Sequence, residues 1–269
     1  MGVRYGLYVA PFSELASPHE LCGLAVTAEG AGFDGFFVWD HVLRPQLGLA
    51  AADPWVALAA VACATSSVRL GALVTPLTRR RPHKVAREVV TLDHLSRGRV
   101  IVGVGLGVDT GGELSRFGEA LEPSVRADRL DEALALLRRY WSGEVVHHRG
   151  EYFQADGVQL LPRPVNGQVP VWVAARGPVP RAMRRAAGND GLFPDRVSPE
   201  ALKEMLSLVA AARGSLDGFD VVAKGPPGDD PAPWLEAGAT WWLVAPPADM
   251  ALAEVREVAR RGPPSPGTT

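Results

Sequence analysis

The chain has 269 residues, of which 47% are hydrophobic, and this length fits two ordinary domains or one large barrel or α/β unit with a full core. The formal net charge of −2 does not predict a surface that binds nucleic acid. No apolar run reaches the roughly 20 residues that span a bilayer. Neither nucleic acid nor membrane is therefore an expected partner.

The N-terminal residues run directly into a strand pattern and lack the anatomy of a signal peptide, which predicts a cytoplasmic protein. Both cysteines, Cys22 and Cys63, lie within apolar helix-like runs, and there is no CxxC motif. This pattern predicts two buried structural thiols in a reducing compartment and argues against a disulfide framework.

Strand-like and helix-like segments alternate along the chain. The predicted strands span residues 3–11, 34–41, 68–77, 99–107, 169–176, 191–194, 219–225 and 240–247. The predicted helices span residues 18–32, 53–65, 81–96, 126–143, 178–190, 198–215, 230–239 and 248–262. Ser17 and Asp53 are the expected N-caps of the first two helices. In the fourth helix one apolar stripe follows helical spacing and contains Leu130, Leu134, Leu137 and Trp141.

Eight strands that are apolar throughout, each followed by a helix, are typical of a parallel sheet covered on both faces. The sequence therefore predicts an α/β fold, a (β/α)₈ TIM barrel, in preference to an open doubly wound sheet, which normally has five or six strands. Residues 1–262 are expected to form this single barrel domain, and residues 263–269 a flexible tail.

Two stretches interrupt the alternation. Residues 108–125 form a long loop, rich in glycine and acidic residues, that is either a lid or binding loop or plain surface. Residues 144–167 are typical of a small insertion hairpin with a proline-rich return.

In a barrel of this kind the catalytic residues lie at the carboxyl ends of the strands. His41 is the one histidine of six that follows a predicted strand in this way. Imidazole suits acid–base chemistry, so His41 is the candidate catalytic residue, with a purely structural histidine as the alternative. Adjacent Asp40 can orient the ring only if the chain bends, because neighbours on a strand face opposite ways. No HxH or HExxH motif accompanies His41, and no metal site is expected.

Two further features at the same end of the barrel suit a phosphorylated cofactor. Gly103, Gly105 and Gly107 follow or end the fourth strand and leave backbone amides without side chains beside them, although glycine there also serves tight packing. Arg176 and Gly177 precede the fifth helix, where a guanidinium and a bare amide favour an anion; a rim ion pair is the alternative for Arg176.

At this point the motifs match a known family. The segments "GFDGFFVWDHV", "VRLGALVTPLTRRRPHKVAREVVTLDHLSRGRVIVGVGLG", "LLPRP" and "VPVWVAARGP" occur in this order, and the chain resembles the luciferase-like flavin and deazaflavin oxidoreductases. The resemblance covers roughly the first seventy per cent of the chain and is most specific around the third strand and helix. It implies a (β/α)₈ barrel with an insertion, a homodimer, and either the deazaflavin coenzyme F420 or FMN as cofactor.

Carried over by motif, the resemblance places Asp40 and His41 near the redox-active ring, beside Trp39. It places a non-prolyl cis peptide behind that ring, which we expect between Ala72 and Leu73, with Thr75 following. The glycines of the fourth strand and Arg176-Gly177 match the family's ring- and phosphate-contacting loops.

The chain departs from the deazaflavin sugar-phosphate dehydrogenases, which it resembles in outline, at two places. They carry an acidic residue directly after the fourth-strand glycines and a tryptophan shortly beyond the histidine, whereas this chain has Val108 and the segment 43–45. A sugar phosphate is therefore not the expected substrate.

The leading hypothesis is hydride transfer between F420 and a small hydrophobic organic substrate at a C=C, C=N or carbonyl group, with His41 as proton donor or acceptor. One alternative is an FMN-dependent monooxygenase that uses O₂ and a separate flavin reductase; a second is a non-catalytic flavin-binding protein. A hydrophobic substrate is suggested by aromatic residues expected at the mouth, namely Phe12, Trp39, Phe117 and Phe193.

Overall fold

The computed structural model describes residues 2–48 and 50–264, and within them nine strand segments form one sheet. They are hydrogen-bonded in the order β3-β2-β1-β11-β10-β9-β8-β5-β4, and every pairing is parallel. The segments are β1 (Arg4–Val9), β2 (Gly35–Val38), β3 (Arg69–Ala72), β4 (Thr75–Pro76), β5 (Val102–Gly105), β8 (Val171–Ala175), β9 (Gly191–Pro194), β10 (Asp220–Gly225) and β11 (Trp241–Val244).

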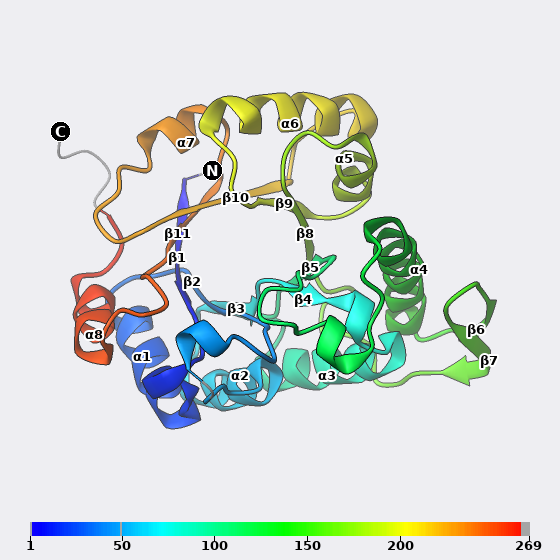
Figure 1. The fold of residues 1–269 in the computed structure, drawn as a ribbon, viewed down its shortest axis with the longest axis horizontal. Coiled ribbons are helices and arrows are strands. Elements are labelled where there is room, and N and C mark those ends of the chain that lie inside the picture. Colours follow the sequence, from blue (N-terminus) through cyan, green and yellow to red (C-terminus); the bar gives the residue numbers. More distant parts are fainter. Residues whose placement is uncertain (1, 49, 265–269) are drawn as a thin grey trace.

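The third predicted strand is divided into β3 and β4 by a turn at Leu73 and Val74. β3 pairs with β2, β4 pairs with β5, and a parallel bridge between Leu70 and Val100 joins the start of β3 to the segment before β5. The sheet therefore closes on itself, and the predicted (β/α)₈ barrel is confirmed (Figure 1).

Helices surround the barrel, as the view along its axis shows (Figure 1). In the described residues the α-helices are α1 (Pro18–Gly30), α2 (Pro54–Ala64), α3 (Pro82–Leu95), α4 (Pro123–Ser142), α5 (Pro180–Ala187), α6 (Pro199–Arg213), α7 (Ala232–Glu236) and α8 (Leu252–Arg261). The predicted caps are confirmed, because Ser17 accepts from the Glu20 N–H and Asp53 accepts from the Val56 N–H. Helix α4 begins three residues earlier than predicted, with a proline in its first turn.

The sheet separates two apolar cores. The inner core fills the barrel and contains Tyr8, Phe37, Leu73, Ile101, Trp172, Phe193, Val222, Trp241 and Leu243. The outer core lies between sheet and helices; for example, Trp172 and Phe193 face inward while their neighbours Val171 and Leu192 face the helices. Because successive side chains alternate between the two faces, the inward positions of each strand can be followed up to the mouth.

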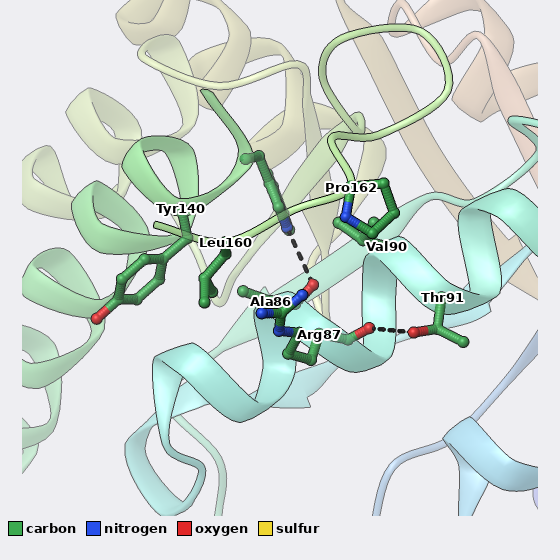
Figure 2. A pocket seen from close by; sticks show the side chains of 8 residues that line it. Ala86, Arg87, Val90, Thr91, Tyr140, Leu160 and Pro162 are labelled. Carbon is green, nitrogen blue, oxygen red and sulfur yellow. Dashed lines mark hydrogen bonds between the residues drawn. The ribbon is translucent and has the colours of Figure 1, made fainter. Parts of the chain in front are cut away.

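The predicted insertion hairpin consists of β6 (Val145–Arg149) and β7 (Gln154–Gln159), which pair antiparallel and project beside α4 (Figure 1). Its return passes over α3 and α4, where a cavity of about 20 Å³ lies among Ala86, Val90, Tyr140 and Pro162 (Figure 2). Trp141 donates its indole N–H to the Ala86 carbonyl at 3.4 Å in this place. A space of that size holds about one water, so this cavity is a packing gap in the helical layer.

Two local predictions are wrong. The non-prolyl cis peptide joins Leu73 to Val74, one residue later than expected, because the Leu73 N–H still donates to the Val38 carbonyl and keeps the Ala72–Leu73 peptide in the ladder with β2. Cys63 is exposed, whereas Cys22 is half-buried. Helix α2 is apolar on its outer face as well as its inner one, so the apolar run could not tell which side Cys63 occupies.

No helix in the described part of the chain is long and apolar enough to cross a membrane. Most of the predicted tail, residues 265–269, lies outside the described residues.

Candidate functional site

His41 follows β2 at the carboxyl end of the barrel and is held there by a glutamate from the long loop after β5. His41 Nδ1 lies 2.6 Å from Glu113 Oε1, and the other carboxylate oxygen accepts from the Val42 N–H at 3.3 Å. The Glu113 side chain is 2% exposed, whereas that of His41 is 21% exposed. A carboxylate accepts hydrogen bonds, so Nδ1 carries the proton of the neutral ring and Nε2 is left as an acceptor.

Asp40 points away from the mouth and holds two arginines. Its Oδ1 accepts from Arg79 at 2.9 Å and from Arg80 at 3.0 Å, and Arg79 also donates to the Asp40 carbonyl at 2.7 Å. The Asp40 side chain is fully buried. The alternation along the strand therefore separates the two neighbours: His41 turns to the mouth, and Asp40 anchors the segment that follows β4.

Arg79 lies between the two buried carboxylates. Its guanidinium contacts Asp40, and it lies 3.9 Å from the second carboxylate oxygen of Glu113. Burial lowers the pKa of Arg79, while Asp40 and Glu113 act in the opposite direction. Arg80 additionally lies 3.9 Å from Asp53 and 3.8 Å from Glu88. The two arginines thus join several carboxylates in a largely buried place, which supports the position of Glu113 beside His41.

The loop that supplies Glu113 is organised by a second acid. Asp109 Oδ1 accepts from the backbone N–H groups of Leu114 and Ser115 at 2.8 and 2.9 Å, and these hydrogen bonds hold the Asp109 pKa below its usual value. Gly111 and Gly112 both have φ of +84°, a conformation that other residues rarely adopt. The chain can therefore turn back sharply and direct Glu113 toward β2.

The glycines of the fourth barrel strand, β5, and the following Gly107 lie directly against the segment from Leu73 to Pro76, whereas the expected neighbour was a cofactor. A Cβ on Gly103 would lie 2.6 Å from Leu73 Cδ2, and one on Gly105 would lie 2.7 Å from Val74 Cγ2. Gly107 has φ of +71° and would meet Pro76. The glycines therefore make room for the turn between β3 and β4, which moves into the barrel and forms the wall at this side of the mouth.

Other predicted residues have distinct places around this wall. Ala72 is the last residue of β3 and is fully buried. Thr75 is also fully buried, in register with Val104 of the outer core, and its hydroxyl has no hydrogen-bond partner among the described residues. Thr75 therefore supports the wall from the helical side.

The opposite side of the mouth carries three charged residues. Arg176 Nε lies 2.9 Å from Asp195 Oδ2, and Lys224 Nζ lies 3.0 Å from Asp195 Oδ1. Next to Arg176, Gly177 has φ of +98°, and a Cβ there would meet open space. The rim ion pair considered for Arg176 is thus present, and there is open space beside Gly177.

Aromatic rings connect the two sides. The Trp39 ring is 5.8 Å from the His41 ring and 6.0 Å from the Tyr8 ring, and Tyr8 is 5.9 Å from Phe193. The indole N–H of Trp39 is buried without a partner in the described part of the chain. Phe117, by contrast, is 63% exposed. An apolar floor with an unpaired donor suits a flat heterocyclic ring, which is the kind of group that a flavin or deazaflavin presents.

The residues that position His41 were not identified from the sequence. The loop 108–125 was recognised as a candidate binding loop, but nothing distinguished Glu113 from the other acids in it. Arg79 and Arg80 follow the third strand directly and could have been found only by pairing them with a strand-end acid. No group of three or more metal-ligating side chains occurs within the described residues.

Comparisons with known proteins identify the family. The sequence model of the family described as luciferase-like monooxygenase matches residues 4–261. An F420-dependent glucose-6-phosphate dehydrogenase of Nakamurella multipartita is 37% identical over 194 residues, which cover 70% of this chain and 54% of that protein. An uncharacterized protein of Mycobacterium tuberculosis is 32% identical over 284 residues, covering 96% of this chain and 98% of that protein. The chain thus spans about half the length of the first relative and nearly all of the second.

Solved structures show the same fold at low sequence identity. An F420-dependent secondary alcohol dehydrogenase in complex with an F420–acetone adduct has a TM-score of 0.79 at 21% identity, covering 97% of this chain and 100% of that one. The F420-dependent tetrahydromethanopterin reductase of Methanopyrus kandleri has a TM-score of 0.78 at 18% identity, covering 97% and 99%. A monooxygenase of Streptomyces bottropensis has a TM-score of 0.75 at 21% identity, covering 96% of each chain.

Proposed function

The chain belongs to the luciferase-like monooxygenase family, and from this we propose that it is an oxidoreductase that transfers hydride between F420 and a small organic substrate. The substrate carries a C=C, C=N or carbonyl group, and His41 moves the accompanying proton. The observation that carries the proposal is the Glu113–His41 contact at Nδ1, which leaves Nε2 of a partly exposed ring available for a proton.

The coenzyme, when bound, supplies the hydride donor or acceptor, and the protein supplies position and electrostatics. We assign its ring to the wall formed by Ala72, Leu73 and Val74 above Gly103 and Gly105, with Thr75 behind it. Trp39 is assigned to the side of the ring near His41; its indole N–H is buried and has no partner among the described residues. Its anionic tail is assigned to the chain at Gly107 and at Gly177, and a Cβ at Gly177 would meet open space.

His41 acts as the proton carrier in this scheme. Nε2 accepts a proton when the substrate is oxidised and returns it when the substrate is reduced, while Glu113 balances the charge that the ring gains. Glu113 is itself a positioning residue, held by the Val42 N–H and the nearby Arg79. Buried Asp40 keeps Arg79 in place and takes no part in the transfer.

FMN is the alternative cofactor, because the same wall and floor accept either ring and a solved neighbour is a monooxygenase. In that case the protein uses reduced FMN from a separate reductase together with O₂. A cofactor-binding protein without turnover is the remaining alternative.

Titration of the purified chain with F420 and with FMN, followed by the change in fluorescence of each, separates the two cofactors. We expect saturable binding of F420 and much weaker binding of FMN. Tight FMN binding without F420 binding would replace the proposal with its monooxygenase alternative.

Substitution of His41 tests turnover with a chosen set of probes. Reduced F420 is supplied with cyclohexenone, acetophenone and 2-methyl-1-pyrroline, which present the three candidate groups. On the best of these acceptors His41→Ala is expected to lose about 10²-fold or more in turnover while its affinity for F420 stays unchanged. His147→Ala, on the exposed hairpin strand β6, is the matched control. A loss of turnover below tenfold would indicate that His41 has a structural role.

We also propose that two copies associate through the outer face of α2. Val56 on that face is 68% exposed, and Ala59, Ala60 and Cys63 continue the same apolar surface. A helix that is apolar all round is normally covered. Light scattering should give twice the mass of one chain, and Val56→Glu should reduce it to one; a wild-type mass of one chain would contradict this.

A further inference from the structure

The second charged group at the mouth is not used by the proton transfer. Three adjacent strands, β8, β9 and β10, carry it at their carboxyl ends. Arg176 follows β8, Asp195 follows β9, and Lys224 is the last residue but one of β10. Each lies an even number of residues beyond an inward side chain, because Trp172, Phe193 and Val222 belong to the inner core. The alternation of the strands therefore directs all three into the mouth.

This group carries one excess positive charge. Two cations share a single carboxylate, at 2.9 Å from Arg176 and 3.0 Å from Lys224. Burial raises the pKa of Asp195, but Lys224 and Arg176 outweigh it, and the net shift is downward. Asp195 is therefore ionised at neutral pH and holds Lys224 in place.

Lys224 retains hydrogen-bonding capacity that the described residues do not use. Its ammonium has three N–H donors, and one of them is accounted for by Asp195. The side chain is 26% exposed, and Nζ lies 5.7 Å from the centre of the Phe193 ring. A cation in this setting, partly withdrawn from water with two donors free, binds anions more strongly than a surface lysine does.

The same aromatic floor joins this cation to His41. Rings within 6.0 Å of one another run from His41 through Trp39 and Tyr8 to Phe193, beside Lys224. Tyr8 and Phe193 are buried, and the side chains at the two ends of this row, His41 and Lys224, are partly exposed. A ligand on this floor meets a proton carrier on one side and a fixed positive charge on the other.

We propose that Lys224, positioned by Asp195 and Arg176, binds an anionic group of the substrate, so that the substrate is an organic acid with a flat or apolar body. The inference rests on the proposed function, because it takes the opposite wall as the place of the cofactor ring. It assigns the three charged residues to substrate selection and leaves the proton transfer to His41.

Equilibrium dialysis with benzoate tests this assignment, with benzyl alcohol as the neutral probe of the same size. Lys224→Met is expected to lower benzoate affinity about tenfold or more, the cost of a charge-assisted hydrogen bond, and to leave benzyl alcohol unchanged. Lys203→Met, on the exposed face of α6, is the matched control and should change neither. Equal benzoate affinity in Lys224→Met and wild type, or no benzoate binding by wild type, overturns the proposal.

The anion that Lys224 binds could belong to the substrate or to the tail of the coenzyme, and measuring the F420 affinity of the same variants distinguishes the two. If Lys224→Met weakens F420 binding as much as benzoate binding, the cation serves the anionic tail of the coenzyme and the substrate assignment is wrong. If F420 does not bind the wild-type protein but Lys224-dependent benzoate binding remains, the proposed function fails and this inference stands.

A measurement on the wild-type protein does not depend on the folding of a variant. Trinitrobenzenesulfonate modifies lysine amines, and mass spectrometry identifies which ones. Benzoate should protect Lys224 but not Lys203, and benzyl alcohol should protect neither. Equal modification of Lys224 with and without benzoate contradicts the proposal.

Discussion

The two charged regions of the mouth differ in how completely their charges are satisfied. On the β2 side, Asp40 and Glu113 are almost completely buried, and Arg79 and Arg80 balance them. On the β8–β10 side the side chain of Asp195 is 22% exposed and its two cations are exposed further. The polar atoms of the first region that lack a partner among the described residues, Asp40 Oδ2, Arg79 Nε and Arg80 Nε, are buried, whereas the second has donors left over on a partly exposed lysine.

This difference indicates two tasks. A buried, neutral network fixes one geometry, because any movement leaves a charge without its partner. A half-exposed group with excess charge can exchange its water for a ligand, because that exchange costs less there. The β2 side is therefore built to hold His41, and the β8–β10 side to receive a group from outside.

The largest expected effect is on stability at the β2 side. Asp40→Ala removes the carboxylate that is hydrogen-bonded to both Arg79 and Arg80, leaves them only longer ion pairs, and should lower the free energy of unfolding by about 3 kcal/mol. Urea unfolding measures this. Asp156→Ala, whose side chain is 77% exposed on β7, should cost less than about 0.5 kcal/mol. Similar costs for the two variants would mean that the ion pairs of Asp40 contribute no more than an exposed pair does, which contradicts the proposed role of the β2 side.

The next effect separates positioning from stability on the same side. Glu113→Gln keeps the shape of the side chain but not its charge, so turnover should fall about tenfold or more, though less than in His41→Ala. F420 affinity and the KM for the acceptor should remain unchanged. Glu119→Gln, in the same loop and paired with Arg129, is the control. A change confined to KM would mean that Glu113 shapes the substrate pocket instead.

The smallest effect is expected at the β8–β10 side, and it depends on pH. The pKa of Asp195 is lower in the folded state than in the unfolded state. Its ion pairs therefore stabilise the fold at pH values above the unfolded carboxyl pKa, which is near 4. This stabilisation is lost as the pH falls through the lower pKa of the folded state. Asp195→Asn should therefore be about 1–2 kcal/mol less stable than wild type at pH 7, and the gap should close in acid. Thermal melts at several pH values measure it, with exposed Asp217→Asn as the control. A stability difference between wild type and Asp195→Asn that grows as the pH falls would contradict the lowered pKa of Asp195.

The fold could be predicted because its signal is periodic. Eight apolar strands separated by helices are local patterns, and closure into a barrel follows from their number. The turn between β3 and β4 was not predicted in its detail. It is accommodated by two residues without side chains, Gly103 and Gly105, and their role is recognisable only once the structure shows Leu73 and Val74 packed against them.

The site was predicted only where a residue follows a strand. His41, Arg176 and Gly177 could be placed at the mouth by their position in the chain. Glu113 reaches His41 from 72 residues away, and Lys224 reaches Asp195 from 29 residues away. Such contacts depend on how a loop folds and on which rotamers the side chains adopt, and a single sequence carries neither.

The orientation of the His41 ring is the most direct test of the account. Nitrogen-15 NMR of the histidine side chains, assigned by comparison with His41→Ala, reports which ring nitrogen bears the proton. We predict that neutral His41 carries its proton on Nδ1, which donates to Glu113, and that Nε2 is unprotonated. A proton on Nε2 would mean that Glu113 does not hold the ring in this way, and it would contradict the central claim.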